Sequence, residues 1–384
     1  MKYPEIYLAV DNCFAGKRWT KPEEWCAVIA DLGIACIEAS ADNELDPFYM
    51  GKEYLADWVP VVKRAAAACN VTIVNLYSGH GSYATLGLTH TDSRVRRRMI
   101  DEWFKPLICV ASELDAGFGF FAHAFPHSVL QSATLYDAQV TSLEEALAEI
   151  NHFAAATGCK KMGLEQMYSP HQYPWTIEQT TRLLTNVTEK SGASFYFTED
   201  LGHHHIKFMR PDEASLKKIC AARRVPPDIW LGSDKAFLFA EEGDYESVKA
   251  EMDATPHLFS TVQDGDCYAW LSELGAYSPI IHLQQTDGKT SAHLPFTTEK
   301  NQWGIIEGGK VLQKLKESYD SAENAALPPR CDKIYLTLEL FTGTAAIVRD
   351  VMDDYRESVA YWRAFIPHDG MTLDKLVQKL KSLS

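Results

Sequence analysis

The sequence predicts an α/β protein of the (β/α)8 TIM barrel class, folded as a single domain over residues 1–384. Eight short apolar runs that end in polar residues alternate with longer amphipathic stretches, as strands and helices do around a parallel sheet. No Gly-x-Gly-x-x-Gly turn follows the first run, which argues against a doubly wound dinucleotide-binding sheet. A hydrophobic content of 46% over 384 residues is enough to bury one large core.

The expected strands are rich in β-branched and aromatic residues. They span residues 6–12, 34–40, 71–80, 118–125, 160–167, 195–204, 279–288 and 333–341. In a barrel of this class, the residues at the carboxyl ends of the strands face the catalytic mouth. The polar residues that close these runs are therefore the first candidates for a functional site.

The expected helices place apolar residues three and four positions apart, which gives each helix an apolar face toward the sheet. The clearest examples span residues 21–33, 54–70, 142–158 and 176–192. They close with Gly or Asn, the residue types that commonly follow a helix C-terminus.

One interval interrupts this rhythm, between the strands expected at 195–204 and 279–288. Its residues 210–230 and 240–259 have helical patterns broken by prolines. A structureless loop of this length would be unusual inside a compact domain. We therefore expect residues 205–264 to form a helical insertion between strands 6 and 7, as a subdomain or lid within the barrel domain.

The composition limits the compartment and the partners. No apolar run of about 18 residues is present and the N-terminus lacks the plan of a signal peptide, so we expect a soluble cytoplasmic protein without membrane contact. The nine cysteines are scattered singly, which suits reduced thiols. A formal net charge of −15 argues against nucleic acid as a partner, and the basic cluster Arg94–Arg98 is expected to be a solvated helix face.

Carboxylates and imidazoles gather at the ends of the expected strands. Glu165 closes the fifth strand, Asp200 and His203 the sixth, His282 lies in the seventh and Glu339 in the eighth. Several buried charges in one small mouth would cost several kcal/mol each unless a cation or partner compensated them. Although each acid alone would also suit a loop cap, the set favours a divalent metal ion with oxygen and imidazole ligands.

The same residues resemble the motifs of the xylose-isomerase-like TIM barrel superfamily. Their order is Glu165, then Asp200-x-Gly202-His203, then His282 within IIHLQQTDG, then Glu339. This superfamily includes ketose 3-epimerases, several sugar isomerases and, more distantly, endonuclease IV. The resemblance covers most of the chain, and the insertion at 205–264 departs from the compact layout of the family.

The resemblance implies one divalent metal ion, with Mn²⁺ favoured and Mg²⁺, Co²⁺ or Zn²⁺ as alternatives. It implies Glu165, Asp200, His282 and Glu339 as the ligands, Glu165 and Glu339 also as the catalytic base and acid, and His203 as a substrate contact. Further candidates for substrate binding, from their positions after the strands, are His80, His123, Asp287 and Gln284.

An endonuclease-like arrangement would bind several metal ions. The histidines that would then join the ligands are His80, His123, His203 and His293. That family pairs an aspartate with the last of these histidines, whereas this chain has Ser291-Ala292-His293. The missing aspartate argues against a full trinuclear site.

These residues favour an enzyme, a metal-dependent sugar isomerase or epimerase that moves a proton beside a carbonyl through a metal-stabilised enediolate. A metal-dependent lyase, hydrolase or dehydratase acting on an oxidised sugar or glycoside is the alternative, and an abasic-site endonuclease is less favoured. A noncatalytic carbohydrate-binding protein would have no need of Glu165 and Glu339. We expect a small-molecule sugar as the substrate; its identity, its phosphorylation and any homo-oligomer stay open.

Overall fold

Eight parallel strands close into a barrel in the computed structural model, which describes residues 2–15, 18–79, 86–204 and 206–383. β1 pairs in parallel with both β2 and β8, so the sheet has no free edge between its first and last barrel strands. The fold class predicted from the sequence is confirmed. The strands are β1 (Glu5–Asp11), β2 (Cys36–Ser40), β3 (Thr72–Ser78), β4 (Gly117–Phe120), β5 (Met162–Glu165), β6 (Tyr196–Asp200), β7 (Ile280–Leu283) and β8 (Lys333–Leu338).

All eight predicted runs contain a barrel strand, but most strands end before the run does. The run predicted at 118–125, for example, contains only the four-residue strand β4. Apolar residues beyond its end, such as Phe121 and Phe125, are buried in the core without belonging to the ladder. A short strand that the sequence did not predict, β9 (Met371–Thr372), pairs antiparallel with β1.

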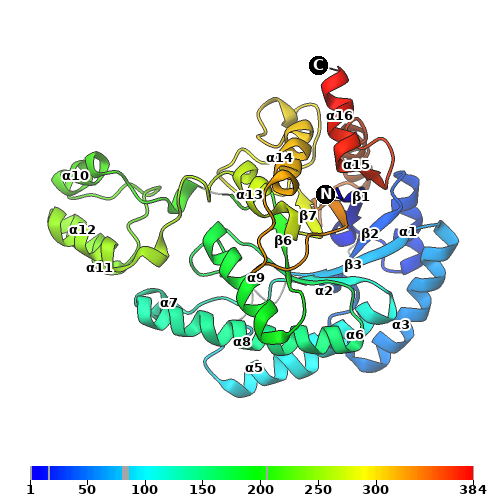
Figure 1. Cartoon of the computed structure of the whole chain (residues 1–384), viewed down its shortest axis with the longest axis horizontal. Coiled ribbons are helices and arrows are strands. Elements are labelled where there is room, and N and C mark those ends of the chain that lie inside the picture. Colours follow the sequence, from blue (N-terminus) through cyan, green and yellow to red (C-terminus); the bar gives the residue numbers. More distant parts are fainter. Residues whose placement is uncertain (1, 16–17, 80–85, 205, 384) are drawn as a thin grey trace.

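Helices surround the barrel, and most of them follow a strand (Figure 1). α8 shows how the sequence sets their ends, because the Ser132 side chain accepts a hydrogen bond from the Leu135 N–H at its start and Gly158, with φ of 89°, ends it. These helices are α1 (Pro22–Asp31), α2 (Ala41–Glu44), α3 (Pro47–Cys69), α5 (Ser93–Met99), α6 (Lys105–Glu113), α7 (His127–Leu130), α8 (Ala133–Thr157), α9 (Ile177–Ser191), α13 (Cys267–Leu274), α14 (Gly308–Asp320), α15 (Val348–Arg363) and α16 (Leu373–Leu383).

Three helices between β6 and β7 stand apart from the barrel: α10 (Glu213–Ala222), α11 (Asp234–Glu242) and α12 (Tyr245–Ala254), at the left of Figure 1. They enclose an apolar cluster that is separate from the barrel core. Its buried members are Leu216, Ile219, Cys220, Leu231, Ala236, Ala240, Val248 and Met252. These helices lie within the predicted insertion at 205–264, whose role as a subdomain or lid stays a prediction.

The basic cluster on α5 is exposed and paired with carboxylates. Arg97 forms ion pairs with Asp101 and Glu149, and Arg98 pairs with Glu102. Exposed pairs of this kind contribute little to stability. Across the described residues, we find no helix whose length and apolar character would let it cross a membrane.

Candidate active site

Four side chains from four neighbouring strands meet at the carboxyl end of the barrel. Glu165 is the last residue of β5, Asp200 is the last of β6, His282 lies in β7, and Glu339 directly follows β8. All four are buried, and one ligand atom from each lies within 4.8 Å of the others. The barrel therefore brings together the four residues that the sequence analysis assigned as metal ligands.

His282 lies at the centre of this group, between carboxylates. Its Nε2 is 2.9 Å from Oε1 of Glu38, and its Nδ1 is 3.1 Å from Oε1 of Glu165 and 3.2 Å from Oε2 of Glu339. Burial alone would lower the pKa of His282, but the negative charges of Glu339 and Glu38 hold it well above the usual value. Without a bound cation, the ring thus compensates part of the surrounding charge.

The pKa of Glu339 is shifted in the opposite direction to that of His282. Burial alone would raise the pKa of its carboxyl, but the rings of His282 and His293 hold this pKa well below the usual value. The His293 Nδ1 lies 3.3 Å from Oε2 of Glu339. Glu339 is therefore ionised and available as a ligand or a base.

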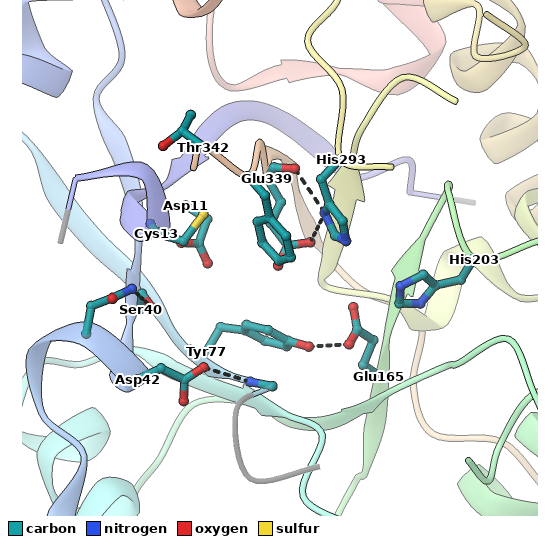
Figure 2. Close-up of a pocket in the computed structure, with 13 residues that line it drawn as sticks. Asp11, Cys13, Ser40, Asp42, Tyr77, Glu165, His203, His293, Glu339 and Thr342 are labelled. Carbon is teal, nitrogen blue, oxygen red and sulfur yellow. Dashed lines mark hydrogen bonds and ion pairs between the residues drawn. The ribbon is translucent and has the colours of Figure 1, made fainter. Parts of the chain in front are cut away.

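A second group of ligand atoms shares Asp200 with the first. It comprises Asp200, His203 and His293, which also lie within 4.8 Å of one another. The His203 Nδ1 is 2.9 Å from the Gln166 carbonyl oxygen, and its Nε2 is 3.5 Å from Oδ2 of Asp200. The His293 ring stacks on Phe341, with centroids 3.7 Å apart. Both histidines border the pocket (Figure 2).

Gln284 lies inside this cluster. Its amide nitrogen donates to Oδ1 and Oδ2 of Asp200 at 2.8 and 2.9 Å. Its amide oxygen accepts a hydrogen bond from the backbone N–H of His293 at 2.6 Å. A Cβ added at Gly202 would lie only 2.2 Å from Cδ of Gln284. The glycine of the Asp-x-Gly-His motif is thus required so that the Gln284 side chain can reach Asp200.

The residues around the site fit a divalent cation. Among the described side chains, Oε2 of Glu38 is buried without a hydrogen-bond partner, and Oε2 of Glu339 and Nε2 of His203 have only the ion-pair contacts given above. Buried polar atoms are normally paired, so these atoms have the capacity to bind a cation. A donor set of carboxylate oxygens and imidazole nitrogens suits Mn²⁺, Mg²⁺, Co²⁺ or Zn²⁺.

A pocket of about 300 Å³ opens above these residues. Figure 2 shows Glu165, Glu339, His203 and His293 on one side, with Asp11, Ser40 and Asp42 on the other. Tyr77 crosses between the sides, and its hydroxyl donates to Oε2 of Glu165. The described lining contains no lysine or arginine and comprises Asp11, Cys13, Ser40, Asp42, Asn43, Tyr77, Gly79, Glu165, His203, His293, Glu339, Phe341 and Thr342.

Three predicted substrate contacts among the described residues, His123, Asp287 and Gln284, do not line this pocket. His80 lies outside the described residues. His123 is fully buried, its Nε2 is 2.7 Å from the Tyr173 carbonyl oxygen, and burial lowers its pKa to about 3. Asp287 is exposed and accepts a hydrogen bond from the Lys289 N–H. His123 lies three residues beyond the end of β4, in an isolated bridge with Gly87, and its ring packs against Phe121 and Phe125.

Two acidic residues of the first two strands also belong to the site, although they were not among the residues predicted from the sequence. Asp11 ends β1, Glu38 lies in β2, and both are buried beside the ligand group. Burial, together with Glu38 and Glu339, raises the pKa of Asp11 well above its usual value. The same rule that selected Glu165 and Asp200, an acid at a strand end, would have found Asp11 and Glu38 in the runs at 6–12 and 34–40.

Known proteins resemble the chain in sequence and in fold. A family model described as xylose isomerase-like TIM barrel matches residues 26–227. A D-erythrulose 1-phosphate 3-epimerase of Brucella abortus (strain 2308) is 24% identical over 288 residues, which cover 74% of this chain and 73% of that protein.

Solved structures share the barrel. A candidate xylose isomerase from Rhodospirillum rubrum ATCC 11170 superposes with a TM-score of 0.65 at 17% identity, covering 94% of this chain and 99% of that one. An L-ribulose 3-epimerase gives a TM-score of 0.55 at 15% identity, with coverage of 99% and 98%. A D-psicose 3-epimerase of Clostridium cellulolyticum H10 gives 0.52 at 13%, with 98% of both chains covered. At these identities, the structural likeness concerns the fold.

Proposed function

Because the chain belongs to the xylose isomerase-like TIM barrel family, we propose that it is a divalent-metal-dependent sugar isomerase or epimerase. The observation that carries this proposal is the buried group of Glu165, Asp200, His282 and Glu339, whose ligand atoms lie within 4.8 Å of one another. The sequence relative named as a 3-epimerase supports the reaction class.

In this proposal the four residues hold one divalent cation, with Mn²⁺ favoured. The contact between Glu38 and His282 Nε2 fits a ligating histidine, whose second nitrogen commonly donates to a carboxylate that fixes the ring. When bound, such a cation would stabilise the negative charge that develops on the substrate's carbonyl oxygen.

In this proposal, proton transfer is carried out by Glu165 on β5 and Glu339 at the end of β8. Glu165 and Glu339 border the pocket at separate points, as Figure 2 shows, so that one can remove a proton from the carbon beside the carbonyl and the other can return it. The Tyr77 hydroxyl, which donates to Glu165, orients that carboxylate. His203 lines the pocket, and in this proposal it contacts the hydroxyl groups of a bound sugar.

A metal-dependent lyase, hydrolase or dehydratase acting on an oxidised sugar or glycoside is the second candidate. The observation that favours it is the helical lobe of α10, α11 and α12, which a compact barrel acting on a small ketose does not require. Both candidates would use the same ligand group.

The test is incubation of Mn²⁺-loaded protein with ketoses and aldoses of four to six carbons in D₂O, followed by NMR. We expect a new sugar and deuterium on the carbon beside the carbonyl, and the labelled position separates isomerisation from epimerisation. A new sugar without deuterium would contradict proton exchange with solvent. Cleavage or dehydration products would favour the second candidate.

A further inference from the structure

A second cleft, of about 730 Å³, lies between the helical lobe and the loop that follows β7. It is larger than the pocket of about 300 Å³ above the ligand group. Its walls come from the segment before α10, from Ser215 in the first turn of α10, from the segment between α10 and α11, and from Lys289. The lining residues are Lys207, Met209, Arg210, Pro211, Asp212, Ser215, Pro227, Asp228, Ile229, Trp230 and Lys289.

Two segments that line the cleft, those that contain Lys207 and Lys289, also reach the catalytic pocket. Lys207 follows His203 by four residues, and Lys289 precedes His293 by four residues. Four residues of even a fully extended chain span about 14 Å at most. Both histidines line the catalytic pocket, so each of these two segments brings a residue of one cavity within this distance of a residue of the other.

Trp230 gives the cleft a fixed aromatic surface. Its Nε1 donates to the Leu258 carbonyl oxygen at 2.7 Å. The ring packs edgewise against Phe208 and Phe237, with centroids 5.3 and 6.1 Å away. The ring is therefore held in place before any ligand binds. The apolar C–H face of a sugar ring packs well on such a surface, as apolar groups do on aromatic walls of binding pockets.

The charges of the cleft nearly cancel. Arg210 is already paired with Asp253, outside the lining. In the part of the chain that the structure describes, the side chains of Lys207, Lys289 and Asp228 form no ion pair. Asp212 adds a second carboxylate, so an anion would meet as many carboxylates as free ammonium groups. Uncharged hydroxyl groups, by contrast, can donate to the aspartates and accept from the lysines.

We propose that this cleft is a subsite for an uncharged glycosyl unit, joined to the sugar that reacts beside Glu165 and Glu339. This inference rests on the proposed function and specifies its substrate class, a neutral glycosylated sugar instead of a free monosaccharide. The inserted segment then serves recognition, because the stretches before α10 and between α10 and α11, together with Ser215 of α10, supply all of the lining except Lys289.

The experiment compares D-fructose with isomaltulose, a fructose that carries a neutral glucosyl unit. Binding is measured by calorimetry on the Mn²⁺-loaded protein, independently of turnover. We expect isomaltulose to bind about tenfold more tightly than D-fructose, and Trp230→Ala and Asp228→Ala to reduce this preference. Asp228 is exposed, so its replacement leaves the fold intact even if the tryptophan variant is unstable. Trp303→Ala, an exposed tryptophan outside the cleft, is the matched control and keeps the preference.

Equal affinities for the two sugars, or the same loss in the Trp303 control, would overturn the subsite. Displacement of isomaltulose by inorganic phosphate would overturn its uncharged character. Deuterium exchange with D-fructose but no isomaltulose preference would leave the proposed function standing and remove the subsite. A Trp230-dependent preference for isomaltulose, without deuterium exchange into any sugar, would support the subsite and contradict the proposed isomerase or epimerase activity.

Discussion

Glu165 and Glu339 carry the chemistry of the proposal, because they border both the ligand group and the pocket. Replacing either with Gln removes the charged base while keeping its size. We expect kcat to fall by about 100- to 10,000-fold in each variant, the usual range for a general base or acid. The assay is deuterium exchange into the substrate. Glu299→Gln, on an exposed side chain, is the control, and near-normal turnover by either catalytic variant would remove its proposed role.

Glu38 acts through His282, whose ring it holds by the contact at Nε2. In Glu38→Gln the fixed carboxylate is lost, so we expect the affinity for Mn²⁺ to fall by about 10- to 100-fold. Titration of metal-free protein with Mn²⁺, followed by electron paramagnetic resonance, measures this affinity. An unchanged affinity would show that His282 needs no such partner.

At the scale of elements, the short helix α2 ends in Glu44, whose carboxyl is buried. Burial raises the pKa of Glu44 to about 7, although the N–H groups of Trp25 and Trp58 act to lower it. A carboxyl whose folded pKa exceeds its unfolded value of 4.5 stabilises the protein below that value and loses this contribution as the pH rises through 7.

Glu44→Gln should therefore gain stability over the natural chain as the pH rises. We expect the difference between their free energies of unfolding to shift by about 3 kcal/mol in favour of the variant between pH 4.5 and pH 8. Urea unfolding at both pH values measures it, with the exposed Glu53→Gln as the control. A difference independent of pH would contradict the buried, protonated state.

The exposed face of α5 gives a contrasting prediction. Neutralising Arg94, Arg97 and Arg98 together removes surface ion pairs that contribute about 0.2–1 kcal/mol each at most. We expect sugar turnover to be unchanged and no measurable DNA binding in either protein. Loss of activity in this variant would point to an anionic substrate or nucleic acid at this face.

For the whole molecule, a cation held by four separate strands should stabilise the closed barrel. Mn²⁺ at a hundredfold excess over its Kd adds about 2.7 kcal/mol to the free energy of unfolding, provided that it binds the folded chain alone. We expect EDTA to lower the Tm and Mn²⁺ to restore it. His282→Ala should abolish this response, whereas His127→Ala, an exposed histidine far from the pocket in the chain, should keep it. The same Mn²⁺ response in both variants would contradict the assigned ligands.

The sequence by itself determined the fold class, and its resemblance to the xylose-isomerase-like superfamily implied the four proposed ligands. The alternation of strands and helices follows from hydrophobic periodicity, and each of the four residues stands at or near the end of one predicted strand. The barrel then requires strand ends to converge, so Glu165, Asp200, His282 and Glu339 meet without further information.

Only the tertiary structure decided which other polar residues join them. Glu38 reaches His282 from a strand on the other side of the barrel, and Gln284 reaches Asp200 because Gly202 leaves room for it. His123 turns into the core, and the cleft around Trp230 forms where an inserted lobe meets a loop far along the chain. These contacts depend on barrel closure and on the path of the loops, which no periodicity in the sequence encodes.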